Sequence, residues 1–470
     1  MDFKDIIDLR GDRIFSDIEK LADNKSNDES DISNSIILSL FQVFSTSFYQ
    51  KDIIYMEKSI QELSRIAETH PIFYFPELDQ YNISQIIIQS LYIPNAKYHN
   101  SLLRFFHFAF KHDQIDFINS FMRNSLFLSL IESINVFPEK EIAIRQSFEI
   151  LNEISMVNKD DNENSESKEL LHQLLEFPFI DLFLKLFRDN NLSQEAIISI
   201  FSIIANIAQD ELSKIEMNNL LILLRQIFDD KSINFMWENA FDTLYLLIAD
   251  KSTAEFVMIK EEFYVQCSRI ILETNDINTI ESIIYVFESY FTYTSLLFTG
   301  IEPVIGKIIQ LSKQYEDLSY PTLCFMISLI RQNHLAILMN FDIFQLLKNC
   351  FQTGKYKIKK MCLKAMKILI PKLTNEQIIK IIIPFNFMED FVQVLCAFNL
   401  HKIFNTSIGI IARLLRSKNS FQPQDIFWVQ FEQSCGVEIL TEIANSDDQE
   451  FAIRASWFLE KIYSLRPLSN

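Results

Sequence analysis

Glycine is scarce in this chain, with only 6 residues among 470, and proline adds 11 more. Folds built on many tight turns or glycine-rich loops need residues that accept a positive φ, so such folds are disfavoured. The segment closest to a phosphate-binding loop is 300–307, where five residues separate the two glycines and the motif has four. Ile308 then follows where a Ser or Thr would bind Mg²⁺. We therefore expect no nucleotide site and no cofactor.

The usual patterns of catalytic and metal-binding residues are also missing. The seven histidines form no H-E-x-x-H pattern, and the sequence holds neither a C-x-x-C pair nor a G-x-S-x-G turn. We interpret the cysteines as small buried apolar residues of a reducing compartment: Cys267, Cys324, Cys350, Cys362, Cys396 and Cys435. The sequence thus predicts a protein that is not an enzyme and has no metal site. An enzyme on a helical scaffold stays open as an alternative that a tight cluster of titratable residues would support.

Hydrophobic runs long enough to cross a membrane are missing as well. The longest, Ala196 to Ala208, falls short of a span and contains Ser and Asn. The first residues lack the basic and apolar regions of a secretory signal. Residues 1–35 hold 10 Asp or Glu against 5 Lys or Arg, and we expect an acidic, partly disordered segment there. We predict a protein of the cytoplasm, or of the cytoplasm and the nucleus, without a membrane span.

What the chain does have is helical periodicity from Ile36 onward and a repeat with a period near 41 residues. Ile207-Ala208 is followed 41 positions later by Ile248-Ala249, and Ile330 lies another 82 positions on. Repeats of this size are typical of stacked helical units, none of which can bury its apolar face alone. Capping boxes predict helix starts at Ser252, Thr374 and Ser446. The 43 Phe residues are expected to fill the core between the helices.

A polar insertion at 158–168 interrupts this register. Asn158, Asp160, Asn162 and Glu169 stand at positions 1, 3, 5 and 12 of a possible calcium loop. Glu163, however, occupies the sixth position, where the sharp turn of such a loop needs Gly. We therefore predict a solvated, metal-free loop within a solenoid that spans residues 36–466.

Several units resemble armadillo repeats. Residues 300–305 (GIEPVI) and 436–440 (GVEIL) resemble the family's opening of the second helix, G-x-x-P-x-[LIV]. Ser202 to Ala208 resembles the third helix, with Asn206 at the family's Asn position, and Ala455 and Trp457 stand at its small and Trp positions. The resemblance implies an all-α, right-handed α-α superhelix of about ten repeats of roughly 41 residues. Most units lack the glycine between the first two helices, so the related HEAT class stays open.

The resemblance also implies which residues face the groove of the solenoid. Importin-α-like members hold an extended peptide with paired Trp and Asn four residues apart. Here Asn206 is preceded at that spacing by Ser202, and Trp457 is followed by Lys461. A nuclear-import receptor is therefore not indicated, but we expect these four residues to line a partner-binding groove.

A basic segment provides the remaining candidates. Residues 354–418 hold 12 Lys or Arg and 3 Asp or Glu, a net of +9 in a chain whose net charge is −19. Lys360, Lys364 and Lys367, which we name the basic row, follow the i, i+4, i+7 spacing of one helix face. Similarity to the family would put Lys364 at the groove-facing Trp position. Either the row binds an acidic or phosphorylated ligand, or it is a solvated helix face.

We therefore expect a monomeric, non-catalytic scaffold that recognises a protein partner along the concave groove of an α-solenoid. The alternative is a regulatory subunit that positions a phosphatase or kinase. Nucleic acid is a disfavoured partner because the overall negative charge would repel it.

Overall fold

The computed structural model describes residues 34–69, 72, 76–111, 115–123, 125–134, 145–152, 194–208, 212–397, 401–416 and 426–464. Every regular element in these ranges is a helix, and none of them contains a β-strand. Most of the acidic segment 1–35 and the whole insertion 158–168 lie outside these ranges, so both expectations stay predictions. The contacts divide the chain into two compact units, residues 1–243 and 244–470. Each unit is described by itself below.

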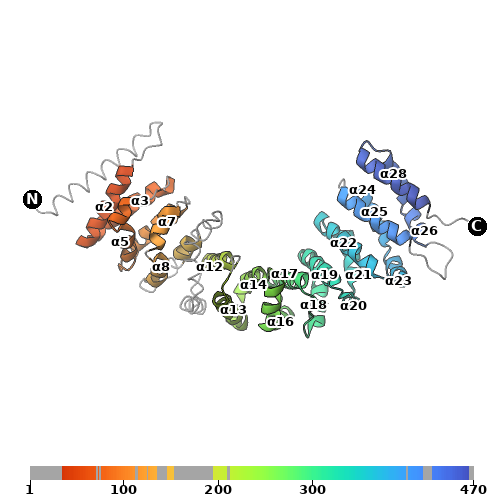
Figure 1. The fold of residues 1–470 in the computed structure, drawn as a ribbon, viewed down its shortest axis with the longest axis horizontal. Coiled ribbons are helices and arrows are strands. Elements are labelled where there is room, and N and C mark those ends of the chain that lie inside the picture. The colour runs from red at the N-terminus through yellow and green to blue at the C-terminus, as the bar shows by residue number, and fades with distance from the viewer. Residues whose placement is uncertain are drawn as a thin grey trace, which may run out of the picture. The chain divides into compact units, whose positions relative to one another are not determined.

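The first unit is built from helical pairs. Within it α3 packs on both α2 and α6, and α5 packs on α2, α7 and α8. Figure 1 shows these helices in order along the chain. Residues 145–152 are also helical. The elements are α2 (Asn34–Gln50), α3 (Ile53–Thr69), α4 (Pro76–Gln80), α5 (Ile83–Ser90), α6 (Ala96–Phe110), α7 (Ile115–Met122), α8 (Leu126–Ile134), α12 (Gln194–Ala208), α13 (Lys214–Asp229) and the short helix η2 (Lys231–Met236).

The core of the first unit is rich in phenylalanine, as the composition predicts. Phe106, Phe110 and Phe121 on α6 and α7 are fully buried, and their ring centroids lie 5.4 to 5.8 Å apart. Tilted and edge-to-face pairs at these distances are favourable beyond the apolar area that they bury. These three phenylalanines therefore serve packing in the core.

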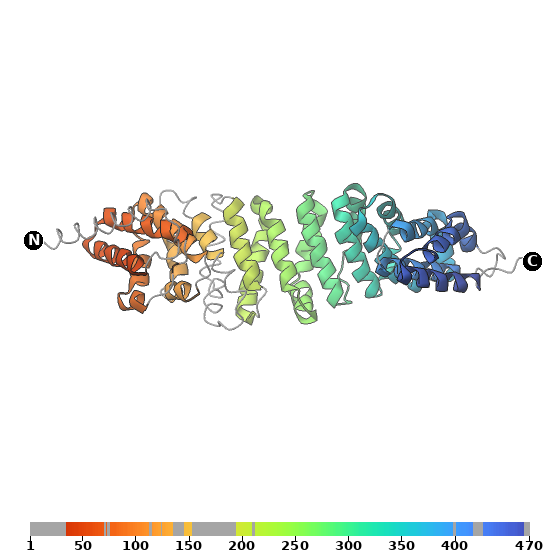
Figure 2. The same ribbon diagram turned by 90° about the horizontal axis from the view of Figure 1, so that it is seen from above.

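The second unit continues the helical pattern after α14 (Trp237–Leu247), which carries the boundary between the units. Figure 2 shows the same helices from above. The elements are α15 (Lys251–Glu255), η3 (Phe256–Lys260), α16 (Phe263–Glu273), α17 (Ile277–Tyr293), α18 (Ile301–Gln314), η4 (Glu316–Leu318), α19 (Ser319–Arg331), α20 (Leu335–Leu338), α21 (Ile343–Thr353), α22 (Tyr356–Leu369), η5 (Ile370–Lys372), α23 (Asn375–Phe385), α24 (Phe387–Ala397), α25 (His401–Leu415), α26 (Ile426–Gln433), α27 (Gly436–Ala444) and α28 (Gln449–Tyr463).

Four helices of the second unit form a continuous row. Helix α17 packs on α19, α19 packs on α22, and α22 packs on α25. Hydrogen bonds from α17 and from the end of α19 reach back along the chain over nearly constant sequence separations. Ser289 donates to the carbonyl oxygen of Ile248 over 41 positions, and Gln332 donates to that of Thr292 over 40. These two bonds satisfy polar groups one repeat earlier in the chain, as expected for units that each depend on their neighbours.

The predicted helix starts are partly right. The capping box at Thr374 is present, since its hydroxyl accepts from Gln377 N while the Gln377 side chain accepts from Thr374 N. The predictions at Ser252 and Ser446 are wrong. In both places an aspartate takes the cap, Asp250 for α15 and Asp448 for α28. A carboxylate accepts charge-assisted hydrogen bonds from the first free amides, so it competes well with a nearby hydroxyl.

The interpretation of the cysteines as buried is also only partly right. Cys267, Cys350 and Cys362 are buried and free. Cys324 is half-buried on α19, and Cys435 is exposed just before α27. The side chain of Cys396 lies outside the described part of the structure.

Candidate binding site on the second unit

Helix α22 places the basic row, and its sequence explains both faces of the helix. Ile358, Cys362, Ala365 and Leu369 form the predicted apolar stripe and are all buried. Because these residues recur at helical spacing, the lysines between them face outward, and Lys360, Lys364 and Lys367 are exposed. The helix runs without Gly or Pro from Tyr356 to Leu369.

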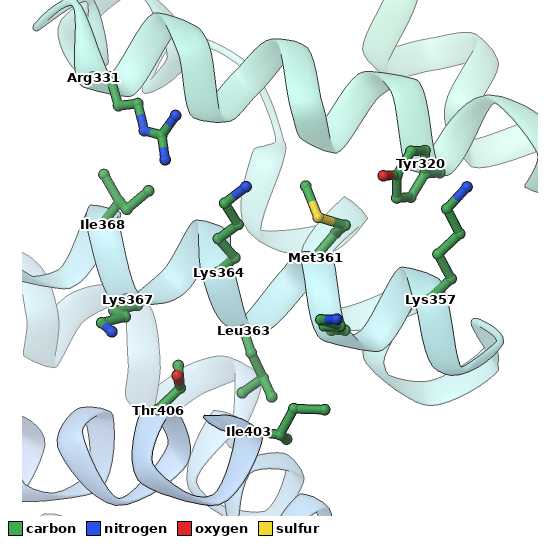
Figure 3. A pocket seen from close by; sticks show the side chains of 11 residues that line it. Tyr320, Arg331, Lys357, Met361, Leu363, Lys364, Lys367, Ile368, Ile403 and Thr406 are labelled. Carbon is green, nitrogen blue, oxygen red and sulfur yellow. The ribbon is translucent and has the colours of Figure 1, made fainter. Parts of the chain in front are cut away.

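A cavity of about 590 Å³ opens over α22 and its neighbours α19 and α25. All three lysines of the basic row line it. We name it the basic cavity, and its lining is Tyr320, Arg331, Lys357, Lys360, Met361, Leu363, Lys364, Lys367, Ile368, Ile403 and Thr406. Figure 3 shows these side chains on the three helices. The sequence prediction that the row lies on one face is therefore right, and that face borders a cavity.

The cations enter the basic cavity from different helices. In Figure 3, Arg331 of α19 and Lys364 of α22 reach toward the same gap between their helices. Lys367 of α22 and Thr406 of α25 also line the cavity. At the other end the Lys357 ammonium sits over the ring of Tyr320, 3.9 Å from its centroid. A cation–π contact of this length holds the lysine in place without neutralising its charge.

The floor of the cavity is apolar. Met361, Leu363 and Ile403 are buried among the helices, with exposed fractions of 8%, 1% and 3%. A site with an apolar floor and a rim of a few charged groups is typical of ligand sites, because burial supplies affinity and the charges fix orientation.

No carboxylate is among the described residues that line the cavity. The structure also gives no ion pair to Lys360, Lys364 or Lys367 within its described ranges. The charge of the row nevertheless acts on its surroundings. Burial and the nearby Glu288 raise the pKa of the Cys324 thiol, while Lys364 and Lys357 lower it. Within the described ranges the row therefore presents positive charge that forms no ion pair, although Glu288 lies close enough to act on the same thiol.

The other predicted site residues do not join this cavity. Ser202 and Asn206 are half-buried on α12 in the first unit. Trp457 is 54% exposed on α28, and the Lys461 ammonium stacks on its ring at 4.1 Å from the centroid. Helix α28 packs on α25, but neither Trp457 nor Lys461 lines the basic cavity. Their predicted role in partner binding stays a prediction.

Sequence reasoning missed several residues of the site. Lys357 carries a signal that could have found it, since it precedes Lys360 by three positions and Lys364 by seven. Tyr320, Arg331, Ile403 and Thr406 come from α19 and α25. No pattern local to α22 points to them.

Other kinds of site find no support in the described residues. These hold no cluster of three or more His, Cys, Asp or Glu side chains placed to bind a metal ion. Within the same ranges, no helix is both long and apolar enough to traverse a lipid bilayer.

The sequence matches no protein-family profile and no curated protein. The structure, in contrast, is similar to solved repeat proteins. The crystal structure of an engineered protein aligns with a TM-score of 0.57 at 12% identity, over 90% of this chain and 99% of that one. A second engineered protein aligns at a TM-score of 0.41 and 14% identity, over 54% of this chain and 100% of that one. A computationally designed armadillo repeat protein for modular peptide recognition aligns at a TM-score of 0.41 and 12% identity, over 51% of this chain and 98% of that one. The predicted resemblance is thus confirmed as a structural similarity, and the chain has an all-helical repeat fold.

Proposed function

We propose that this chain is a non-catalytic scaffold whose second unit binds an acidic or phosphorylated segment of a protein partner in the basic cavity. The observation that carries the proposal is the basic row, which lies over an apolar floor and has no carboxylate partner in the described structure. A carboxylate or phosphate would make charge-assisted hydrogen bonds to these ammonium groups.

The arrangement also favours a peptide over an isolated small anion. The cations line the cavity from α19 and along the length of α22, so a segment with several negative groups can contact more of them than a small anion can. The apolar floor of Met361, Leu363 and Ile403 would at the same time cover an apolar side chain of that segment.

The test is affinity capture from a cell extract with the full chain as bait, followed by mass spectrometry. We expect Lys360→Glu, Lys364→Glu and Lys367→Glu together to lose the main partner. The variant should still fold, because the buried stripe of α22 is untouched. A control that replaces the exposed Lys111, Lys214 and Lys260 with Glu changes the net charge equally and should keep the partner.

Two further arms separate the possible outcomes. Binding to the native protein should weaken as salt is added, since screening acts on exposed charges. Phosphatase treatment of the extract distinguishes a phosphorylated segment, whose capture is lost, from an acidic one, whose capture persists. If the triple variant retains its partners at wild-type levels, the basic row is only a solvated face and the proposal is wrong.

A further inference from the structure

A second charged surface lies on the helices just before the basic cavity. Tyr245 of α14 and Tyr285 of α17 meet edge to face, with ring centroids 6.3 Å apart. Glu281 and Glu288 flank Tyr285 along α17 at i−4 and i+3, so they lie on the same helix face. We name these four residues, all within the second unit, the tyrosine–glutamate strip.

The strip is accessible and its parts are held in place. Tyr245 is 41% exposed, and Tyr285, Glu281 and Glu288 are half-buried. Oε1 of Glu288 accepts hydrogen bonds from the hydroxyls of Ser328 and Thr292, each at 3.2 Å. These bonds fix the carboxylate between α17 and α19 and leave Oε2 without a hydrogen bond in the described structure.

The electrostatic environment of the strip is negative. Burial first, and then Glu288, raises the pKa of Tyr245. Burial also raises the pKa of Tyr285, with Glu281 adding to the effect through its charge and a hydrogen bond. Within the described ranges neither glutamate forms an ion pair with a Lys or Arg. The strip therefore lacks the cation that its carboxylates and aromatic faces would both attract.

Tyr320, in the next helix of the row, indicates what kind of group fits. The ammonium of Lys357, a cation from this same chain, already lies over its ring. Tyr245 and Tyr285 have the same kind of aromatic face and carboxylates beside it, but no such cation within the described residues. An Arg or Lys side chain satisfies both features, because the ring quadrupole and the carboxylate each attract positive charge.

We propose that the tyrosine–glutamate strip binds an Arg or Lys side chain of the same partner segment whose acidic part occupies the basic cavity. The inference rests on the proposed function, and it adds that the ligand is bipolar. Helix α17 lies two steps before α22 in the row, and neighbouring helices pack about 8–10 Å apart. An extended chain rises about 3.3 Å per residue, so about six residues separate the basic side chain from the acidic ones.

The test measures binding of labelled synthetic peptides to the full chain by fluorescence anisotropy at low salt. The acidic probe carries three consecutive glutamates on a Gly/Ser backbone with one leucine beside them. The bipolar probe adds an arginine about six residues away, in one version before the glutamates and in another after them. A matched probe has glutamine in place of that arginine.

We expect the arginine to tighten binding about tenfold over glutamine in one of the two orders, the gain expected from a cation–π contact beside a carboxylate. The variant with Glu281→Gln and Glu288→Gln should lose this gain while binding the acidic probe at least as tightly. Tyr285→Leu should also reduce the gain. The control Glu302→Gln with Glu316→Gln, which alters exposed glutamates outside the strip, should preserve it.

The outcomes separate the two proposals. If the acidic probe binds but arginine and glutamine probes bind equally in both orders and at separations from about four to eight residues, the strip is not a cation site. If the gain persists in the double glutamine variant, the arginine is bound elsewhere and the inference is again wrong. If the acidic probe does not bind, even with phosphoserine replacing glutamate, the proposed function itself fails.

Discussion

The buried ion pair between Lys348 and Asp390 allows a sharp test of how neighbouring helices are coupled. Lys348 lies on α21 and Asp390 on α24, and the ammonium and carboxylate groups are 2.7 Å apart. Only 12% of the lysine side chain and 8% of the aspartate side chain are exposed. The ammonium also donates to the carbonyl oxygen of Asn386 at 3.4 Å. We predict that losing either charge alone destabilises this region far more than losing both.

The sign of the prediction follows from two opposed influences on Asp390. Burial raises the pKa of this carboxyl, and Lys348 lowers it by a smaller amount, so the pKa stays above its ordinary value. The attraction of Lys348 therefore offsets only part of the cost of burying the charge. Because the folded-state pKa is raised, ionisation of Asp390 costs stability at neutral pH.

The magnitudes differ strongly between the variants. Asp390→Leu leaves the Lys348 ammonium buried without a counter-charge. Lys348→Met likewise leaves the Asp390 carboxylate buried without a counter-charge. Breaking a buried pair in this way costs about 3–5 kcal/mol. Replacing both partners by these apolar residues should be neutral, or stabilising by about 1–4 kcal/mol. The coupling in the double-mutant cycle should therefore amount to several kcal/mol.

Hydrogen–deuterium exchange is the suitable assay because unfolding of a repeat protein is often not two-state. Peptides from α21 and α24 should exchange much faster in each single variant and at the wild-type rate or slower in the double variant. If the double variant exchanges as fast as the two single effects combined predict, the pair is not coupled and the reasoning is wrong. The same follows if Lys348→Met alone changes nothing.

Two further predictions concern other buried positions. His99 is buried beside Ser133, and burial lowers its pKa from 6.5 to about 4, so its contribution to stability is full above pH 6.5 and lost as the pH falls toward 4. The loss of stability between these pH values amounts to about 3 kcal/mol. A thermal melting series across that pH range should show this loss in the native protein and a smaller loss in His99→Gln. Gly354→Ala should destabilise the start of α22, because the added Cβ would lie 2.4 Å from the carbonyl oxygen of Cys350 and 2.7 Å from Ile358. Unchanged exchange rates in α21 and α22 would contradict this.

Periodicity predicted much of α22 from the sequence. The buried stripe and the exposed lysines follow from one helical period, and the structure agrees with both. The cavity beside the lysines could not be predicted, since Arg331 and Ile403 come from helices one repeat away. Their approach depends on how the side chains of three helices pack, and a spacing rule within one helix contains no such information.

Helix starts and the proposed binding surface on α17 show two other limits of prediction from the sequence. Where several cap-forming residues follow one another, as around Asp250 and Asp448, the sequence alone does not decide which one caps. The tyrosine–glutamate strip has no motif of its own. It becomes visible only when Tyr245 and Tyr285, 40 positions apart, are found in ring contact.

The basic row itself raises the question of whether its charges favour or oppose folding. Lys360 and Lys364 are four residues apart on α22, and Lys364 and Lys367 are three apart. Each such pair of like charges costs about 0.2–0.5 kcal/mol. The chain as a whole has a net charge of −19, however, and its field would attract these lysines.

Neutralising the row decides between these effects. Glutamine has nearly the helix propensity of lysine, so replacing all three lysines with glutamine changes mainly the charge. If repulsion within the row dominates, the glutamine variant should protect α22 better against exchange, by up to about 1 kcal/mol, and the difference should shrink at high salt. Stability would then be lower in the native protein for the sake of a charged surface, as is common at binding sites. Faster exchange in the glutamine variant would mean that the lysines stabilise the fold, and their cluster would then need no ligand to explain it.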